Sequence, residues 1–226
     1  MRLIRSKRRT LVLQVNVQGK LVVRAPQRMT LFRIQSFVLE KQAWIDRTRQ
    51  RLQKKYITVK PPQFTEGELF WYLGVTYPLR LISEVKEPLI LTDCFVLAAH
   101  FAVKAHLLLK KWYMAEAARI IEERVQYFCE QFQFTYTKIR LSSAEKRWGS
   151  CSVRNTLNFS WKLIMAPVAA IDYVVVHELV HTQHKNHGKR FWSKVENVLP
   201  HYRVGKRWLK EHGHLLIWIS GDRNFK

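Results

Sequence analysis

Three residues in the second half of the chain, His177, Glu178 and His181, form the pattern H-E-x-x-H. On a helix, side chains four positions apart lie on the same face, so the two imidazoles can bind one metal ion. Glu178 stands next to the first imidazole and can take a proton from a metal-bound water without itself being a ligand. Zinc suits such a ligand set. The pattern therefore predicts one Zn²⁺ ion and the chemistry of metal-assisted hydrolysis.

Two further histidines, His184 and His187, are candidates for a third ligand. Helix geometry favours His184, which lies on the same face as His177 if the helix is unbroken. However, His177 and His184 would then be about 10 Å apart along the axis, too far for a tetrahedral ion. Asn186 and Gly188 tolerate a left-handed turn that would end the helix and bring His187 back. We therefore predict that His187 is the ligand and that His184 is a nearby polar residue contacting substrate or solvent.

A buried helix is needed to position these side chains. Apolar residues at 171–176 would bury one side of a helix that begins near Pro167, which argues against a surface helix with solvated histidines. Alternating apolar residues predict a strand at 157–163. The end of that strand, or the segment 148–151, can lie beside the helix and pair with an extended peptide, although either can equally be buried. The candidate substrate-binding residues are Trp148, Gly149, Ser150 and His184.

The first part of the chain predicts two β-hairpins separated by one helix. Apolar and polar residues alternate on both sides of Gly19 and again on both sides of Gly74. Between them, Thr30 is a plausible N-cap for a helix with a basic outer face. Glu87-Pro88 is the best boundary, so we expect an amino-terminal β-rich subdomain at 1–88 and a second domain at 89–226.

The second domain is expected to begin with a long helix. Apolar residues recur every three or four positions from Leu97 to Phe132, which predicts one long amphipathic helix or two consecutive ones. Shorter helices are expected after Gly188 and from Tyr202 to near Gly213.

The net charge of +22, from 39 Lys and Arg against 17 Asp and Glu, is the second strong feature. Such an excess favours polyanions, either nucleic acid or an anionic membrane surface, although it can also simply keep a protein soluble. The candidate nucleic-acid-binding residues form a basic helical face: Arg47, Arg49, Arg51, Lys54 and Lys55.

Composition and cysteine usage indicate a globular protein in a reducing compartment. Hydrophobic residues make up 47% of 226 residues, which excludes a disordered chain. The three cysteines are widely spaced and form neither a disulfide framework nor a cysteine zinc site. No targeting segment and no run of ~20 apolar residues is present, so a cytoplasmic location is expected.

Several blocks of the second domain resemble the YgjP-like zinc metallopeptidases, which are related to the SprT-like proteins. The blocks are R-W-G-S-C-S at 147–152, L-N-F-S-W-K-L-I-M-A-P at 157–167, I-D-Y-V-V-V-H-E-L-V-H at 171–181, N-H-G-K-R-F-W at 186–192 and K-R-W-L-K at 206–210.

This resemblance implies an α+β fold with a zincin-like catalytic region, in which the active-site helix lies beside a small antiparallel sheet and follows a hairpin-rich amino-terminal part. It also implies zinc held by His177, His181 and His187, with Glu178 as general base. The chain departs from the pattern at Lys185, where proline is common, and at Gly188, where serine is common.

Two functions follow from these features. The first is a cytoplasmic zinc-dependent peptidase acting on peptide or protein substrates. The alternative is a nucleic-acid-associated basic protein whose zinc is structural or regulatory. That alternative requires a fourth protein ligand, which His184 or Cys151 would have to supply.

Overall fold

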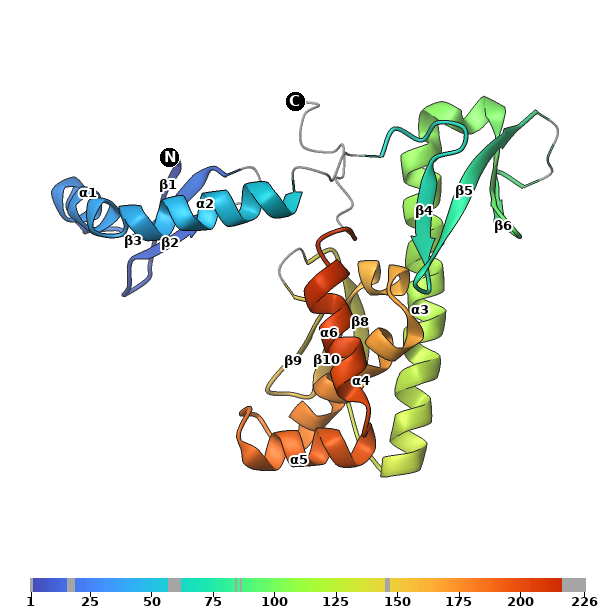
Figure 1. Cartoon of the computed structure of the whole chain (residues 1–226). Helices are drawn as coiled ribbons and strands as arrows, with labels where there is room; N and C mark the ends of the chain where they lie inside the picture. Colours follow the sequence, from blue (N-terminus) through green and yellow to red (C-terminus); the bar gives the residue numbers. More distant parts are fainter. Residues whose placement is uncertain are drawn as a thin grey trace. The chain divides into compact units, whose positions relative to one another are not determined.

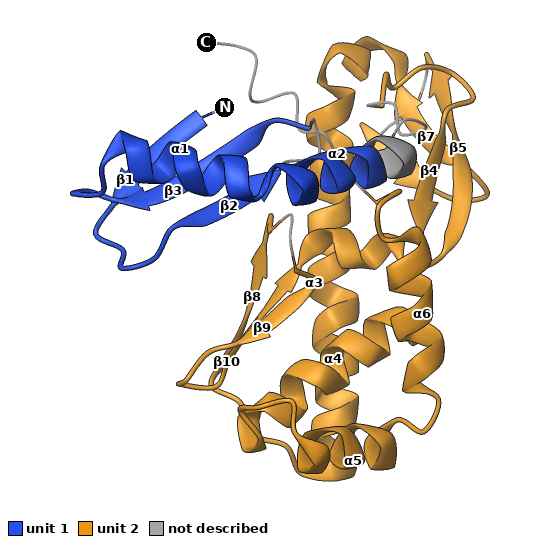
Figure 2. Ribbon diagram, turned by 60° about the vertical axis from the view of Figure 1, so that its left-hand side comes forward, with its two compact units in different colours: residues 1–60 blue, residues 61–226 orange. Residues whose placement is uncertain are grey.

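The computed structural model describes residues 2–15, 19–56, 62–83, 85, 87–144 and 147–216, with only the backbone described at 53–56. The chain forms two compact units, residues 1–60 and 61–226 (Figure 2). This division precedes the second hairpin, whereas the sequence predicts a boundary at 88. The reason is packing, because Phe70 and Leu79 of that hairpin belong to the core of the larger unit. Whether residues 1–88 and 89–226 have separate functions stays a prediction.

The smaller unit is a three-stranded sheet with two helices. Strands β1 (Arg2–Ser6), β2 (Val12–Val15) and β3 (Leu21–Pro26) have the order β1-β3-β2, with β3 antiparallel to β2 and parallel to β1. The predicted first hairpin is therefore confirmed. Helices α1 (Leu31–Glu40) and α2 (Gln42–Tyr56) replace the single predicted helix, which is interrupted at Lys41. Every second residue of β3 is buried, namely Leu21, Val23 and Ala25. These three side chains form the core of the unit together with Ile34 of α1 and Ile45 of α2.

A four-stranded sheet and one long helix begin the larger unit. Strands β4 (Leu69–Tyr72), β5 (Val75–Ile82), β6 (Leu89–Leu91) and β7 (Phe95–Ala98) have the order β4-β5-β7-β6. A 3₁₀ helix, η1 (Ala99–Lys104), leads into α3 (Ala105–Phe132). The predicted long helix thus starts eight residues after Leu97, which lies in β7. Figure 1 shows that the β4–β5 hairpin lies beside one end of α3, and that α4 and the second sheet lie along the rest.

The second sheet lies beside the helix that carries the H-E-x-x-H pattern. Strands β8 (Lys138–Ser142), β9 (Gly149–Cys151) and β10 (Thr156–Ser160) have the order β8-β10-β9. The sheet is mixed rather than antiparallel, because β10 is parallel to β8 and antiparallel to β9. The predicted strand at 157–163 ends at Ser160, and the buried 3₁₀ helix η2 (Trp161–Met165) follows it. Helices α4 (Val168–Gln183), α5 (Lys189–Val198) and α6 (Tyr202–His212) complete an α+β fold, as predicted.

Helix α4 is held in place from three directions. At its start, the β4–β5 turn donates hydrogen bonds from Leu73 N to Ile164 O (2.9 Å) and from Gly74 N to Met165 O (3.1 Å). Asp172 pairs with Arg124 of α3 through two contacts of 2.6 and 3.0 Å. On a third side, α6 crosses α4 closely through Gly205, where an added Cβ would lie 2.9 Å from the Cα of Ala170.

Within the described residues, no helix is both long and apolar enough to span a membrane.

The close crossing predicts that Gly205→Ala destabilises the larger unit. On a free helix surface this change would stabilise by about 1 kcal/mol. Here the added methyl group meets the backbone of α4, so we expect a net loss of roughly 1–3 kcal/mol in the free energy of unfolding. Urea unfolding measures this loss. Val204→Ala, at the neighbouring 61% exposed position, is the control and should change stability by less than about 0.5 kcal/mol. Equal stability of both variants would contradict the close crossing.

Candidate metal centre

The imidazoles of His177, His181 and His187 converge on one point. The Nε2 atom of His187 lies 3.0 Å from Nε2 of His177 and 3.1 Å from Nε2 of His181. Two nitrogens bound to a tetrahedral zinc ion at 2.0–2.1 Å would lie roughly 3.3 Å apart, so the observed spacing is close to that of a zinc ligand set. Lone pairs of neutral imidazoles repel one another at such distances unless a proton or a metal ion lies between them. The three residues therefore fit a divalent metal.

The end of α4 brings His187 to the other two histidines. The helix ends at Gln183, and His184 has extended backbone angles (φ −127°, ψ 100°). The chain then reverses, with Gly188 N donating to Asn186 O (2.9 Å), before α5 starts after Gly188. The expected left-handed turn at Asn186 or Gly188 is wrong, because neither residue has a positive φ. The extended residue at 184 changes the chain direction instead.

His184 contributes its backbone to the centre. Nδ1 of His181 donates a hydrogen bond to the His184 carbonyl oxygen at 2.9 Å. Because that nitrogen carries the proton, the Nε2 lone pair is free to bind a metal. The side chain of His184 does not belong to the histidine cluster. His177 differs from His181, since its buried Nδ1 has no hydrogen-bond partner in the described part of the chain.

Burial keeps the first two imidazoles neutral, as a metal ligand must be. It lowers the pKa of His177 to about 3, and the charges of His181, His187 and Lys206 act in the same direction. Burial also lowers the pKa of His181, while the hydrogen bond to His184 opposes that shift. These rings are therefore available as ligands without first losing a proton.

Glu178 is buried beside β9. Glu178 is only 5% exposed, and burial raises the pKa of its carboxyl group to about 8. The charge of Arg147 and a hydrogen bond from the Cys151 backbone N–H both oppose this shift. Its Oε2 atom has no partner within the described residues. A divalent cation at the histidine cluster would favour the ionised carboxylate. Such a group suits a general base, since it can both accept and release a proton near neutral pH.

Gly149 allows this arrangement. A Cβ atom at position 149 would lie 2.7 Å from both Cγ and Oε1 of Glu178, so only glycine leaves room for the carboxyl group. The sequence predicts Gly149 as a substrate-binding residue, but its contact in the structure is with Glu178. The sequence does not predict that Gly149 makes room for the Glu178 carboxyl group or that the charge of Arg147 acts on it. The one signal for these contacts is the R-W-G pattern at 147–149.

The other predicted substrate-binding residues have structural contacts. The ring of Trp148 packs against the larger core and approaches Gly213. The carbonyl oxygen of Ser150 accepts a hydrogen bond from Nδ2 of Asn158 at 3.4 Å. The strand that contains Ser150, β9, is nevertheless an edge strand, because only β10 pairs with it in the described sheet. A role in substrate binding stays a prediction for both residues.

A fourth protein ligand is not found in the described part of the chain. The three histidines are the one group there whose ligand atoms lie close enough together to hold a metal ion, and the group includes neither Cys151 nor His184. Cys151 faces Lys185, whose Nζ lies 3.9 Å from Sγ. Nζ of Lys185 also donates to Asn155 Oδ1 (2.6 Å), and this contact links the loop before His187 to the turn between β9 and β10. A metal at this centre would therefore keep a position open for water or substrate.

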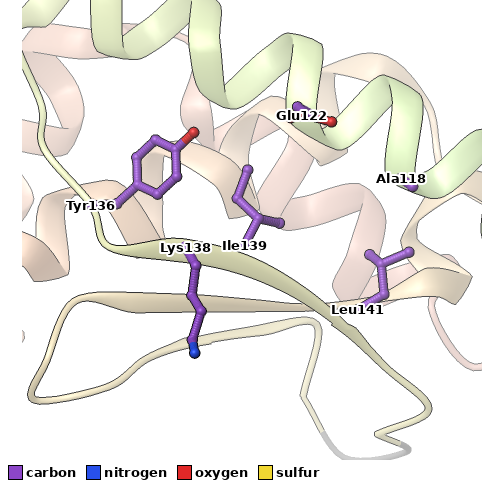
Figure 3. Close-up of a pocket in the computed structure, with 6 residues that line it drawn as sticks. All are labelled: Ala118, Glu122, Tyr136, Lys138, Ile139 and Leu141. Atoms are coloured by element: carbon purple, nitrogen blue, oxygen red, sulfur yellow. The ribbon is translucent and has the colours of Figure 1, made fainter.

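The predicted basic face and a separate pocket lie outside the metal centre. Arg47, Arg49 and Arg51 are exposed on α2, and Arg49 also donates to Gly19 O (3.2 Å), whereas the side chains of Lys54 and Lys55 lie outside the described residues. In the larger unit, a pocket opens between α3 and β8, where Ile139 points toward α3 and Lys138 points away (Figure 3). It contains no predicted site residue.

Comparison with known proteins identifies one family. The family described as YgjP-like, metallopeptidase domain, matches residues 9–212. The match includes both helices of the smaller unit as well as the histidine cluster, and it confirms the resemblance seen in the sequence. The chain matches no curated protein and no solved structure.

We expect the protein to bind one Zn²⁺ ion per chain and the variant His187→Ala to lose it. Removing one of three ligands should weaken zinc binding by at least about 100-fold. His184→Ala should retain zinc, because the backbone carbonyl that orients His181 is unchanged. Zinc content after mild chelation measures both effects. Loss of zinc from His184→Ala but not from His187→Ala would show that the ligand assignment is wrong.

Proposed function

The chain belongs to the YgjP-like metallopeptidase family, and from this premise we propose that it is a zinc-dependent peptidase. The convergence of three imidazole Nε2 atoms, next to a buried carboxyl group in an H-E-x-x-H helix, carries the proposal. The absence of a fourth protein ligand among the described residues supports catalysis over a purely structural zinc site.

Each residue of the centre has a distinct role in the proposed hydrolysis. When bound, zinc lowers the pKa of water and polarises a carbonyl group. His177, His181 and His187 hold the ion, and the His184 carbonyl fixes the ring of His181. Glu178 accepts the proton of the attacking water at Oε2 and delivers it to the leaving amine. A bound cation favours the ionised form of Glu178, which is the form that accepts the proton.

The edge strand β9 is the proposed guide for the peptide substrate. It contacts β10 on one side, and Glu178 lies against Gly149 at its start. An extended peptide added along the edge of β9 that no described strand pairs with, where the Cys151 N–H contacts Glu178, would form main-chain hydrogen bonds beside the proposed base. Main-chain recognition of this kind tolerates many side chains, so sequence preference has to come from other contacts.

A second proposed activity is binding of nucleic acid through the smaller unit. Residues 1–60 contain 16 Lys and Arg but only 2 Asp and Glu, so this quarter of the chain carries most of the net charge. Two ion pairs in the described part of this unit, Lys41–Glu40 and Arg49–Asp46, use both acidic residues. With 2 acidic against 16 basic residues, the unit keeps a large net positive charge, which favours contact with a polyanion. The free cysteines Cys94, Cys129 and Cys151 support the expected reducing, cytoplasmic setting.

We expect Glu178→Gln to bind zinc like the wild type and to lose peptidase activity by on the order of 10³-fold, because the base is removed and the ligands remain. Zinc content and cleavage of a quenched fluorescent peptide library, with and without DNA, measure the two properties. Glu123→Gln, at an exposed position of α3, is the control and should leave both unchanged. Near wild-type cleavage by Glu178→Gln would exclude Glu178 as the base.

The charge of the smaller unit predicts salt-sensitive binding to DNA or RNA with little sequence preference. Each phosphate neutralised adds about 0.9 to the slope of log affinity against log salt for duplex DNA. The double variant Arg47→Ala/Arg51→Ala should therefore lower that slope by up to about 2 in fluorescence titrations. Arg119→Ala/Arg203→Ala, which removes two arginines already paired with acidic residues, is the control. Absence of binding at low salt would contradict this proposal.

A further inference from the structure

Three aromatic side chains form a continuous shelf beside the histidine cluster. Trp192 of α5 stacks on Tyr202 of α6 with ring centroids 5.7 Å apart, and Tyr202 stacks on Tyr173 of α4 at 6.1 Å. Both ends of this aromatic shelf contact His177, with centroid distances of 5.8 Å to Tyr173 and 5.9 Å to Trp192. Glu178 instead lies against β9. The shelf is therefore a separate wall of the centre.

Lys206 places a positive charge on this shelf. It follows Tyr202 by one helical turn, so both side chains lie on the same face of α6. Its Nζ atom is 4.1 Å from the centroid of Trp192 and 5.9 Å from that of Tyr202, within the range of cation–π attraction. Gly205, the preceding residue, is where α6 crosses α4 most closely, so the backbone of Lys206 is fixed relative to the ligand helix.

No acidic group of the described chain pairs with Lys206. Arg203, one of two arginines of α6, is paired with Glu196 at 2.7 Å. Lys206, by contrast, is exposed and contacts aromatic rings. An ammonium group that is oriented by a ring face keeps its N–H donors available for an incoming anion.

We propose that Lys206 is a specificity-determining residue that binds a carboxylate of the substrate next to the scissile bond. The inference rests on the proposed peptidase function and names its substrate class: peptides with a carboxylate near the cleavage site, from an acidic side chain or a free carboxyl terminus. The metal ion and Lys206 are both cationic, so a substrate anion between the aromatic shelf and the metal would be attracted by both. Main-chain pairing with β9 cannot supply this selectivity.

Binding of three hydroxamate peptides to the zinc-loaded protein tests the proposal without requiring turnover. Each probe carries a metal-binding hydroxamate followed by two residues: Leu-Gln amide, Leu-Glu amide, or Leu-Gln with a free carboxyl terminus. We expect at least one carboxylate probe to bind about three- to tenfold more tightly than the neutral probe in calorimetry. The preference should shrink as salt is raised. The better carboxylate probe identifies which source of the anion the protein prefers.

Lys206→Met keeps the stem of the side chain over Trp192 and removes only the charge. We expect this variant to bind all three probes equally, with unchanged affinity for the neutral probe and an unchanged melting temperature. Arg203→Met removes a charge of the same helix that is already paired, and it should keep the wild-type preference. Equal binding of the three probes by the wild type, or a preference that persists in Lys206→Met, would overturn this inference alone. A protein that binds no zinc would overturn the proposed function as well.

Discussion

Burial of α4 is the constraint on which the centre depends. The helix is surrounded by α3, α6, η2 and β9, and most of its residues are buried, including Asp172 and Glu178. A buried polar group on this helix costs free energy unless a specific partner compensates it. Burial raises the pKa of Asp172, and the paired Arg124 opposes that shift. The carboxyl group of Glu178 has weaker compensation, since its Oε2 atom has no partner among the described residues, and burial raises its pKa to about 8.

The third histidine shows how the end of a helix can complete a site that the helix cannot form alone. Two imidazoles one turn apart supply two ligands, and a third residue further along the same helix lies too far away to bind the same ion. Extended backbone at His184 both redirects the chain and presents a carbonyl oxygen to His181. One residue therefore links the orientation of the second imidazole to the position of His187, so the loop and the helix must be ordered together.

Local patterns in the sequence predicted most of the elements, whereas contacts between distant residues were not predictable. The hairpins and the helix of the H-E-x-x-H pattern depend on short-range periodicity, whereas the position of His187 depends on extended backbone at His184 and not on the predicted left-handed turn. Errors occur where every residue is buried, as in β7 and η2, because burial on all sides removes the alternation that distinguishes strand from helix. The contact of Gly149 with Glu178, and the aromatic shelf, arise only from tertiary packing.

The close approach of Gly149 to Glu178 has a consequence for the ancestry of this fold. Because a methyl group at 149 would occupy the space of the carboxyl group, a side chain at 149 is compatible only with a shorter or displaced residue at 178. A lineage that gained a side chain at 149 would therefore have to shorten or move Glu178. A single substitution in strand β9 can thus displace the acid of the H-E-x-x-H pattern without any change in the helix itself.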